Sequence, residues 1–398
     1  MPMLAIYAER ALTPLEEIRD AVILVDGARI AAVGRKGEVS VPRGAREFSA
    51  AAGYTIVPGF VDVHIHGAGG HDVMEGTDAA FDAVTSAVAR FGTTSIVATT
   101  VTASPEDTCR SVAAIARAAA KRGAAGSGSD SARAEILGVH FEGPFISAAR
   151  RGVHPAEWIA APSVALLERF VDAAEGAARI VTLAPELPGA LDLVSAARRR
   201  GIVAAMGHTD ASYAEAEAAI AAGVRHAAHV FNAMRPFSHR ETGVLGAVLT
   251  SREVTAELIA DGVHVDDAAI RVLLAAKGVE RTVLVSDGTA ATGMPDGRYR
   301  LGSFEVNVSG GVCRNAEGKL AGSTLTLDRA VRHMVSLGVG LPDALRMATT
   351  NPAGVIGLSG RKGILAPGAD ADLVLLDAQL HVARVMALGV WESGAAQK

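Results

Sequence analysis

The sequence predicts an α/β fold, a (β/α)8 TIM-type barrel with a small β-sandwich domain formed from both chain termini. Eight short apolar runs rich in β-branched residues occupy the middle of the chain, and alanine-rich segments of helical periodicity separate most of them. Strands that are apolar throughout and alternate with helices are typical of a parallel sheet covered by helices, and eight such units close into a barrel. The predicted strands are residues 56–64, 94–101, 136–141, 180–183, 202–205, 227–231, 255–259 and 282–285.

The predicted helices follow these strands along the chain. Their apolar residues recur every three to four positions, which indicates one buried face for each helix. The predicted helices include residues 78–90, 105–122, 190–200, 214–222 and 267–276. Segment 121–132 is rich in glycine and serine, and we predict that it is a flexible loop between a helix and a strand.

Both ends of the chain show short apolar runs separated by turns. Near the start, Asp26 and Gly27 separate the runs 21–25 and 29–33, which predicts a hairpin. Near the end, the run 371–376 follows a proline–glycine turn. We therefore predict three segments. Residues 1–55 and 366–398 together form the small β domain, and residues 56–365 form the barrel.

The composition excludes several classes of protein. The 398 residues carry 38 lysines and arginines against 43 aspartates and glutamates, a formal net charge of −5, and no run of basic residues. We therefore expect no nucleic-acid partner. No apolar stretch reaches the roughly 20 residues that a membrane span requires, and the N-terminus does not resemble a signal peptide. Two cysteines in so long a chain favour a reducing compartment, so we expect a cytoplasmic protein without membrane contact.

Histidines and carboxylates gather where the predicted strands end. Active sites of such barrels lie at the carboxyl ends of the strands. On the first strand, His64 and His66 alternate, so both side chains face the same side. Imidazole and carboxylate groups are the ligands of Zn²⁺, Fe²⁺ and related ions, so their coincidence at one end of the barrel predicts a divalent-metal site. The residues concerned are His64, His66, Glu142, His208, His229, His264 and Asp287.

Single residues of this set have simpler interpretations. A lone buried histidine is more often a hydrogen-bonded core residue than a ligand. Asp287 could cap the turn that follows it, and Arg240 could be a solvated loop charge. The metal prediction therefore rests on the whole set and not on any one member.

The motifs around these residues resemble a known superfamily. Residues 58–67 (PGFVDVHIHG) resemble the opening motif of the amidohydrolase superfamily, and residues 363–374 resemble its closing motif. Within it, the chain resembles the N-acetylglucosamine-6-phosphate deacetylase family from about residue 56 to 376. The motifs that carry this resemblance are GVHFEGP at 138–144, MGHTD at 206–210, HVFNAM at 229–234, DGVHV at 261–265 and SDGTAATG at 286–293.

The resemblance implies a metal-dependent amide hydrolase that removes acetate from N-acetyl-D-glucosamine 6-phosphate to give D-glucosamine 6-phosphate. It implies that Asp287 is the general base and then the general acid. His154 and His264 match substrate contacts of the family, with His154 near the acetamide carbonyl. The ligands of the main catalytic metal that it implies are Glu142, His208 and His229.

The resemblance also implies a phosphate-binding group made of Asn232, Ala233 and Arg240. In this family the arginine can serve the site of a neighbouring subunit, which implies a homodimer. The expected partner is a phosphorylated N-acetyl amino sugar.

The number of metal ions depends on His64 and His66. Some family members carry Gln-x-Asn at these positions and use one metal, so the two histidines imply a second ion, with Glu142 bridging the pair. We expect one or two divalent ions per subunit. Zn, Fe, Mn and Co all suit these ligands.

Other functions remain open. Deacetylation of N-acetylgalactosamine 6-phosphate differs only in the orientation of one hydroxyl. Ring-opening amidohydrolases usually carry a carbamylated lysine on the fourth strand, and residues 180–186 contain no lysine. A deaminase does not usually show the Glu142 motif. A non-catalytic scaffold would be expected to have lost part of the ligand set.

Some histidines have no implied role. His140 alternates with Glu142 along one strand, so it either lines the site or orients a ligand from behind. His71 and His226 are interpreted as surface or packing residues, and His239 is left without a role.

Overall fold

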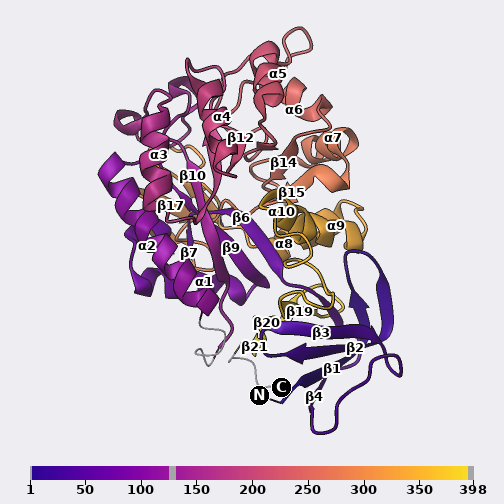
Figure 1. Cartoon of the computed structure of the whole chain (residues 1–398). Helices are drawn as coiled ribbons and strands as arrows, with labels where there is room; N and C mark the ends of the chain where they lie inside the picture. Colours follow the sequence, from indigo (N-terminus) through magenta and orange to yellow (C-terminus); the bar gives the residue numbers. More distant parts are fainter. Residues whose placement is uncertain (1, 125–130, 393–398) are drawn as a thin grey trace.

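The computed structural model describes residues 2–124 and 131–392, and it confirms the predicted fold class (Figure 1). Helices surround a barrel of parallel strands. The strands from the two ends of the chain lie together in a separate sheet beside the barrel (Figure 1). The residue limits predicted for the two domains stay a prediction.

All eight predicted barrel strands are present and pair in parallel in chain order. A bridge between Ile65 and Gly288 joins the first strand to the residues after the last. The predicted run 227–231 corresponds to a very short strand at His226–Ala227, because the chain turns out of the sheet directly after Ala227. The strands are β6 (Phe60–Ile65), β9 (Thr93–Thr100), β10 (Glu135–Glu142), β11 (Ala178–Leu183), β12 (Val203–Met206), β13 (His226–Ala227), β14 (Thr255–Leu258) and β15 (Thr282–Leu284).

The five predicted helices correspond to α1, α2, α4, α5 and α7. The predicted loop 121–132 begins later than expected, since α2 continues to Ala124, and residues 125–130 lie outside the described part. Helix α6 escaped prediction because nearly all of it is buried, so it shows no polar face. The helices are α1 (Asp78–Ala89), α2 (Pro105–Ala124), α3 (Val164–Ala173), α4 (Ala190–Arg199), α5 (Tyr213–Ala222), α6 (Gly243–Thr250), α7 (Asp267–Lys277), α8 (Leu327–Ser336), α9 (Leu341–Ala348) and α10 (Thr350–Val355).

The length and hydropathy of a helix decide whether it can span a membrane. Within residues 2–124 and 131–392, no helix is both long enough and apolar enough to cross a membrane.

The terminal sheet has eight strands in the order β21-β20-β19-β5-β1-β2-β3, with β4 beside β1. The predicted hairpin at Gly27 is confirmed as the β2–β3 turn. Ile30 accepts a hydrogen bond from Gly368 and donates one to Ala369, so the sheet folds around a core of its own. The strands are β1 (Leu4–Leu12), β2 (Glu17–Asp26), β3 (Arg29–Arg35), β4 (Arg46–Ser49), β5 (Thr55–Pro58), β19 (Leu373–Leu376), β20 (Val382–Ala387) and β21 (Val390–Trp391).

The predicted first strand, 56–64, is in fact two strands. β5 belongs to the terminal sheet, where it pairs with β1 and β19, and β6 begins the barrel. Gly59 lies between them, and a side chain there would collide with Thr94, since a Cβ would lie 2.1 Å from its Oγ1. The close approach that glycine permits lets the chain pass from one sheet into the other.

A small three-stranded sheet that the sequence did not predict follows the last barrel strand. It consists of β16 (Gly297–Leu301), β17 (Phe304–Ser309) and β18 (Val312–Arg314), and it lies between β15 and α8 in the chain. Together with the loop after β18, it reaches the carboxyl end of the barrel, where Leu301 and Leu320 become part of a cavity wall.

A buried ion cluster joins the terminal sheet to the amino end of the barrel. The Nζ atom of Lys362, which has no exposed surface, lies 2.5 Å from Glu135, 2.9 Å from Asp370 and 2.8 Å from Asp372. Arg361 bonds to Glu135 and Asp370 as well. A buried charge is tolerated only when it is paired, and among the described residues Lys362 is the ion-pair partner of Asp372, whereas Glu135 and Asp370 also pair with Arg361.

The Lys362→Ala variant is therefore expected to lose about 3–5 kcal/mol of unfolding free energy, because it leaves the buried Asp372 without a cation and removes one of the cations at Glu135 and Asp370. Urea denaturation followed by circular dichroism measures the change. Lys121→Ala removes an exposed ion pair with Asp78 and serves as the control, with no measurable shift expected. Equal midpoints for Lys362→Ala and the unchanged protein would contradict the role of the cluster.

Candidate active site and metal centre

The carboxyl ends of the barrel strands meet at a cavity of about 180 Å³. Every predicted site residue except His64 and Arg240 lines it. His64 is fully buried behind this lining, on β6. The predicted residues that line the cavity are His66, Glu142, His154, His208, His229, Asn232, Ala233, His264 and Asp287.

The carboxylate of Glu142, the last residue of β10, lies at the centre of the site. Its Oε1 atom is 3.3 Å from Nε2 of His64, 3.1 Å from Nε2 of His208 and 2.8 Å from Nε2 of His229. The Nε2 atoms of His208 and His229 are 3.1 Å apart. Ligands bound at 2.0–2.1 Å to one tetrahedral ion lie about 3.3 Å from one another, so this spacing matches a shared metal ion.

The donor set also has a buried atom that needs a partner. Nε2 of His64 makes no hydrogen bond within the described residues, although it faces the same carboxylate. A buried polar atom without a partner costs about 1–3 kcal/mol. His64, His66 and Asp287 bring their ligand atoms within 4.8 Å of one another, beside the Glu142 group. These residues fit a divalent cation, and their arrangement offers two adjoining positions on either side of Glu142.

Hydrogen bonds on the far side of two rings determine which nitrogen is free. Nδ1 of His66 donates to the carbonyl of Thr99, and Nδ1 of His208 donates to the carbonyl of Arg150, each at 3.0 Å. A carbonyl only accepts, so both Nδ1 atoms carry the proton. Burial lowers the pKa of His208 to about 4, so its ring is neutral at pH 7. Its Nε2 lone pair is then available to a cation.

His154 has the opposite arrangement. The backbone N–H of Thr102 points at Nδ1 of His154 at 3.3 Å. A backbone N–H only donates, so Nδ1 accepts and a neutral ring carries its proton on Nε2. That Nε2 lies 3.3 Å from Oε2 of Glu142, at the cavity surface. His154 is therefore a hydrogen-bond donor facing the cavity and not a free lone pair, which agrees with the predicted substrate contact.

Asp287 follows β15 and faces His64 on β6 and His66 directly after that strand. Its Oδ1 atom is 3.2 Å from Nε2 of His66 and 3.8 Å from Nε2 of His64. Burial acts to raise the pKa of Asp287, but the hydrogen bond with His66 and the charge of His64 outweigh burial and lower it. The side chain is thus ionised at neutral pH and able to accept a proton.

Several site residues adopt a left-handed backbone conformation, which is uncommon for residues other than glycine. The strain persists because surrounding bonds hold it. The amide of Asp287, for example, donates to His64, and its carbonyl accepts from Ser323. Such residues cluster at functional sites. The φ angles are 47° at His208, 25° at His229, 49° at Ala233 and 48° at Asp287.

The outer part of the cavity is formed by His264, Asn232 and two leucines. Nδ1 of His264 donates to Asp261 at 2.7 Å, which leaves Nε2 as its second polar atom. Asn232 donates to the carbonyl of His229 at 3.2 Å, so its side chain is held next to a predicted metal ligand. Leu301 and Leu320 add apolar surface.

Arg240 is the predicted residue that the fold does not bring to the cavity. It is exposed on the loop between Ala233 and α6, and it is absent from the cavity lining. The neighbouring Phe237 is 53% exposed. Within a single chain, Arg240 therefore does not complete the predicted phosphate group.

Glu257 was not among the predicted site residues, and of the two interpretations given for His226, surface or packing, the structure shows packing. Glu257 on β14 is fully buried, and it bonds to His64 at 2.8 Å and to His226 at 2.9 Å. Burial acts to raise the pKa of Glu257, but the charges of His64 and His226 outweigh burial and hold it well below its usual range. His226 is not a surface residue but is buried in this pair. A charged residue inside an apolar strand was the available signal for Glu257.

His140 and His71 have structural partners. His140 lies behind the site, where it bonds to the carbonyl of Val63 and to Thr182 and packs edge-on against His64, with ring centroids 4.6 Å apart. It does not line the cavity, so the second of its two predicted roles is the compatible one. His71 is partly exposed and pairs with Glu75.

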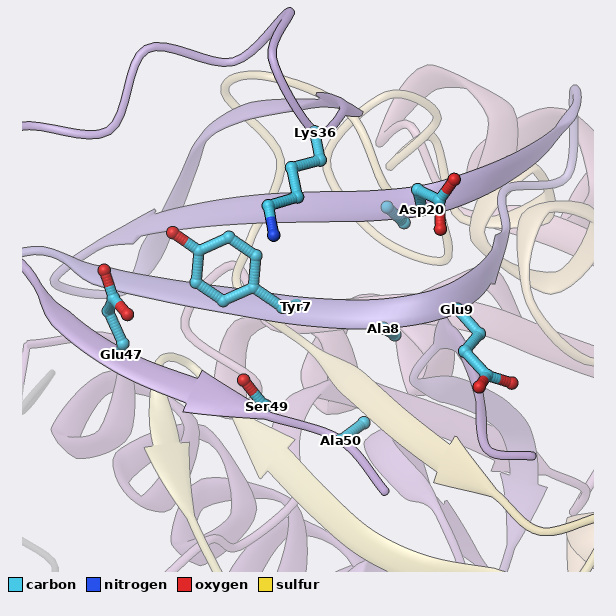
Figure 2. A pocket seen from close by; sticks show the side chains of 9 residues that line it. Tyr7, Ala8, Glu9, Asp20, Lys36, Glu47, Ser49 and Ala50 are labelled. Atoms are coloured by element: carbon cyan, nitrogen blue, oxygen red, sulfur yellow. The ribbon is translucent and has the colours of Figure 1, made fainter. Parts of the chain in front are cut away.

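A second pocket lies on the terminal sheet, away from the barrel mouth (Figure 2). Lys36 extends over the ring of Tyr7, 5.9 Å from its centroid, with Glu47 beside the ring and Asp20 and Glu9 farther along the sheet. Its lining holds no histidine. The metal-binding chemistry described above therefore belongs to the barrel cavity.

Comparison with known proteins agrees with the geometry. The Amidohydrolase family model matches residues 55–392. The chain is 37% identical to N-acetylglucosamine-6-phosphate deacetylase of Bacillus subtilis (strain 168), over 85% of this chain and 84% of the relative. It is 40% identical to N-acetylgalactosamine-6-phosphate deacetylase of Escherichia coli O157:H7, over 84% and 86%.

A solved structure of the same kind matches nearly the whole fold. It is a mutant N-acetyl-D-glucosamine-6-phosphate deacetylase from Mycobacterium smegmatis in complex with N-acetyl-D-glucosamine-6-phosphate. The TM-score is 0.88 at 39% identity, covering 98% of this chain and 99% of the other. Members of the amidohydrolase superfamily are metal-dependent, which agrees with the histidine and carboxylate clusters at the barrel mouth. The chain belongs to the amidohydrolase family, among the deacetylases of 6-phosphorylated N-acetyl amino sugars.

Proposed function

We propose that this enzyme hydrolyses the acetamide of N-acetyl-D-glucosamine 6-phosphate to give D-glucosamine 6-phosphate and acetate. The observation that carries the proposal is the cluster of imidazoles around Glu142, which opens with Asp287 onto one cavity. The Bacillus and Mycobacterium relatives are named for this substrate. The Escherichia relative is named for the galactosamine epimer at similar identity, so that epimer is the second candidate.

Glu142, His208 and His229 would hold one divalent cation, and His64 and His66 would hold a second next to it. A divalent cation in such a site lowers the pKa of water and polarises the amide carbonyl. The ligand types suit Zn²⁺, Fe²⁺, Mn²⁺ and Co²⁺, so one or two of these ions per subunit are proposed.

The proton moves through Asp287. Its carboxylate accepts a proton from the attacking water as the oxygen bonds to the acetyl carbon. When the carbon–nitrogen bond breaks, the same group returns the proton to the departing amine. The Nε2–H of His154 is placed to donate to the oxygen on which negative charge develops. His264, Asn232 and the backbone at Ala233 bind and orient the sugar phosphate.

We assign Arg240 to the phosphate of a substrate bound in a second copy of this chain, so the active form is a homodimer. Two observations support this assignment. Arg240 is exposed, and the loop that carries it begins at Ala233, which lines the cavity. A guanidinium offers two parallel donors to phosphate oxygens. Two free cysteines are consistent with the reducing cytoplasm, where we place the enzyme.

The purified protein is expected to release acetate from N-acetyl-D-glucosamine 6-phosphate, to lose this activity after chelation and to regain it with Zn²⁺, Fe²⁺, Mn²⁺ or Co²⁺. A coupled acetate assay measures the rate, with the galactosamine epimer and the unphosphorylated sugars run in parallel. No acetate from any of these sugars, with each metal supplied in turn, would refute the proposal.

The Asp287→Asn variant is expected to lower kcat by about 10²–10⁴-fold, because an amide does not accept the proton, while the ion proposed at Glu142, His208 and His229 stays bound. Steady-state kinetics and elemental analysis measure the two quantities. Asp266→Asn is the control. It changes a carboxylate that caps α7, and it is expected to leave kcat unchanged. Substantial turnover by Asp287→Asn would show that another group is the base.

The Arg240→Ala variant is expected to raise KM at least about tenfold for the phosphorylated sugar and to leave the unphosphorylated sugar unaffected, because a charge-assisted pair is worth more than 1.4 kcal/mol. Arg252→Ala, another exposed arginine, is the control. Mixed dimers of Arg240→Ala and Asp287→Asn subunits then test which site the arginine serves. Recovery of activity on mixing supports service across subunits, and no recovery rejects it.

A further inference from the structure

Glu257 lies beneath the proposed metal ligands and takes no direct part in the proposed reaction. Its Oε2 atom accepts hydrogen bonds from Nδ1 of His64 at 2.8 Å and from the backbone N–H of His229 at 2.9 Å. Its Oε1 atom accepts from Nε2 of His226 at 2.9 Å. One side chain on β14 thus contacts two proposed ligands that come from β6 and from the turn after β13.

The bond to His64 determines which nitrogen of that ring faces the cavity. The backbone N–H of His229 only donates, so Oε2 of Glu257 is an acceptor, and the proton of the neighbouring bond lies on Nδ1 of His64. Nε2 is then the nitrogen left for a cation, which takes its lone pair by displacing the proton that a charged ring carries there. This nitrogen points to Glu142 and Asp287, at 3.3 and 3.8 Å, and makes no hydrogen bond itself.

The bond to His229 acts on the backbone. β13 ends at Ala227, and His229 adopts a φ of 25°, so the sheet no longer determines the position of this residue. Glu257 holds this segment at two points. Its carboxylate accepts from the backbone N–H of His229, and its backbone carbonyl accepts from the backbone N–H of Val230. His226 holds the second carboxylate oxygen, which keeps the carboxylate plane from rotating.

We propose that Glu257 is the positioning residue of the metal centre, setting the tautomer of His64 and the backbone position of His229, with His226 keeping its carboxylate in place. This inference rests on the proposed metal roles of His64 and His229. Carboxylates that hold the second nitrogen of a metal-binding imidazole raise metal affinity, and their loss typically costs about 10–100-fold. The expected consequence is loss of metal from a folded protein.

The test measures Zn²⁺ affinity of the metal-free protein against a chromophoric chelator, without any activity assay. Glu257→Met fills the volume but accepts no hydrogen bond, so Zn²⁺ is expected to bind about 10–100-fold more weakly. Glu257→Gln keeps an amide oxygen for His64 and His229 and is expected to restore most of the affinity. Should Glu257→Met fail to fold, Glu257→Asp replaces it, because the shorter chain withdraws the oxygens from both partners.

Glu135→Gln is the matched control, because it also removes a buried carboxylate from a barrel strand, at the opposite end of β10 from Glu142. It is expected to lower the unfolding midpoint and to leave Zn²⁺ affinity unchanged. His64→Gln is the reference for loss of the ligand. Weaker binding in both Glu257→Met and His64→Gln, with rescue by Glu257→Gln, supports the inference.

Three results would overturn the inference. If Glu257→Met binds Zn²⁺ as tightly as the unchanged protein while His64→Gln binds it more weakly, Glu257 has no positioning role, although His64 remains a ligand. Equal losses in Glu257→Met and Glu257→Gln show that charge and not geometry matters. Unchanged affinity in His64→Gln and Glu257→Met removes the proposed metal role of His64, and the positioning inference with it.

Discussion

The burial of the Glu142 carboxylate among imidazoles is the constraint on which the site depends. An ion taken out of water costs several kcal/mol unless opposite charge and hydrogen bonds compensate for it. Burial acts to raise the pKa of Glu142, but the charge of His64 and the hydrogen bonds of His154, His208 and His229 outweigh burial and lower it well below its usual range. These residues come from distant parts of the chain, so the carboxylate is stabilised only when the barrel is closed.

The chemistry of His66 and of His154 is decided by the partner behind each ring. The Thr99 carbonyl places a proton on Nδ1 of His66 and leaves Nε2 for a cation. The backbone N–H of Thr102 donates to Nδ1 of His154, so the proton of a neutral ring lies on Nε2, which faces the cavity. Two histidines that look alike in the sequence are thereby separated into a proposed ligand and a proposed donor.

The substrate side of the cavity is built from less regular parts. Leu301 and Leu320 come from the small sheet and loop inserted after β15, and they close one wall with apolar surface. Arg240 stands outside on an exposed loop. The proposed metal ligands thus all come from one chain, whereas the proposed phosphate contact would need a second copy.

The sequence by itself determined the barrel, because β-branched apolar runs and helical periodicity report local burial directly. It also placed His64, His66, Glu142, His208, His229 and Asp287 at one end of the barrel, because carboxyl ends of parallel strands share an edge. Only the tertiary structure decided the proton positions, the exposure of Arg240 and the place of Glu257. Those depend on contacts between segments far apart in the chain, such as the bonds of Glu257 to His64 and His229, and the spacing of residues along the chain carries no record of such contacts.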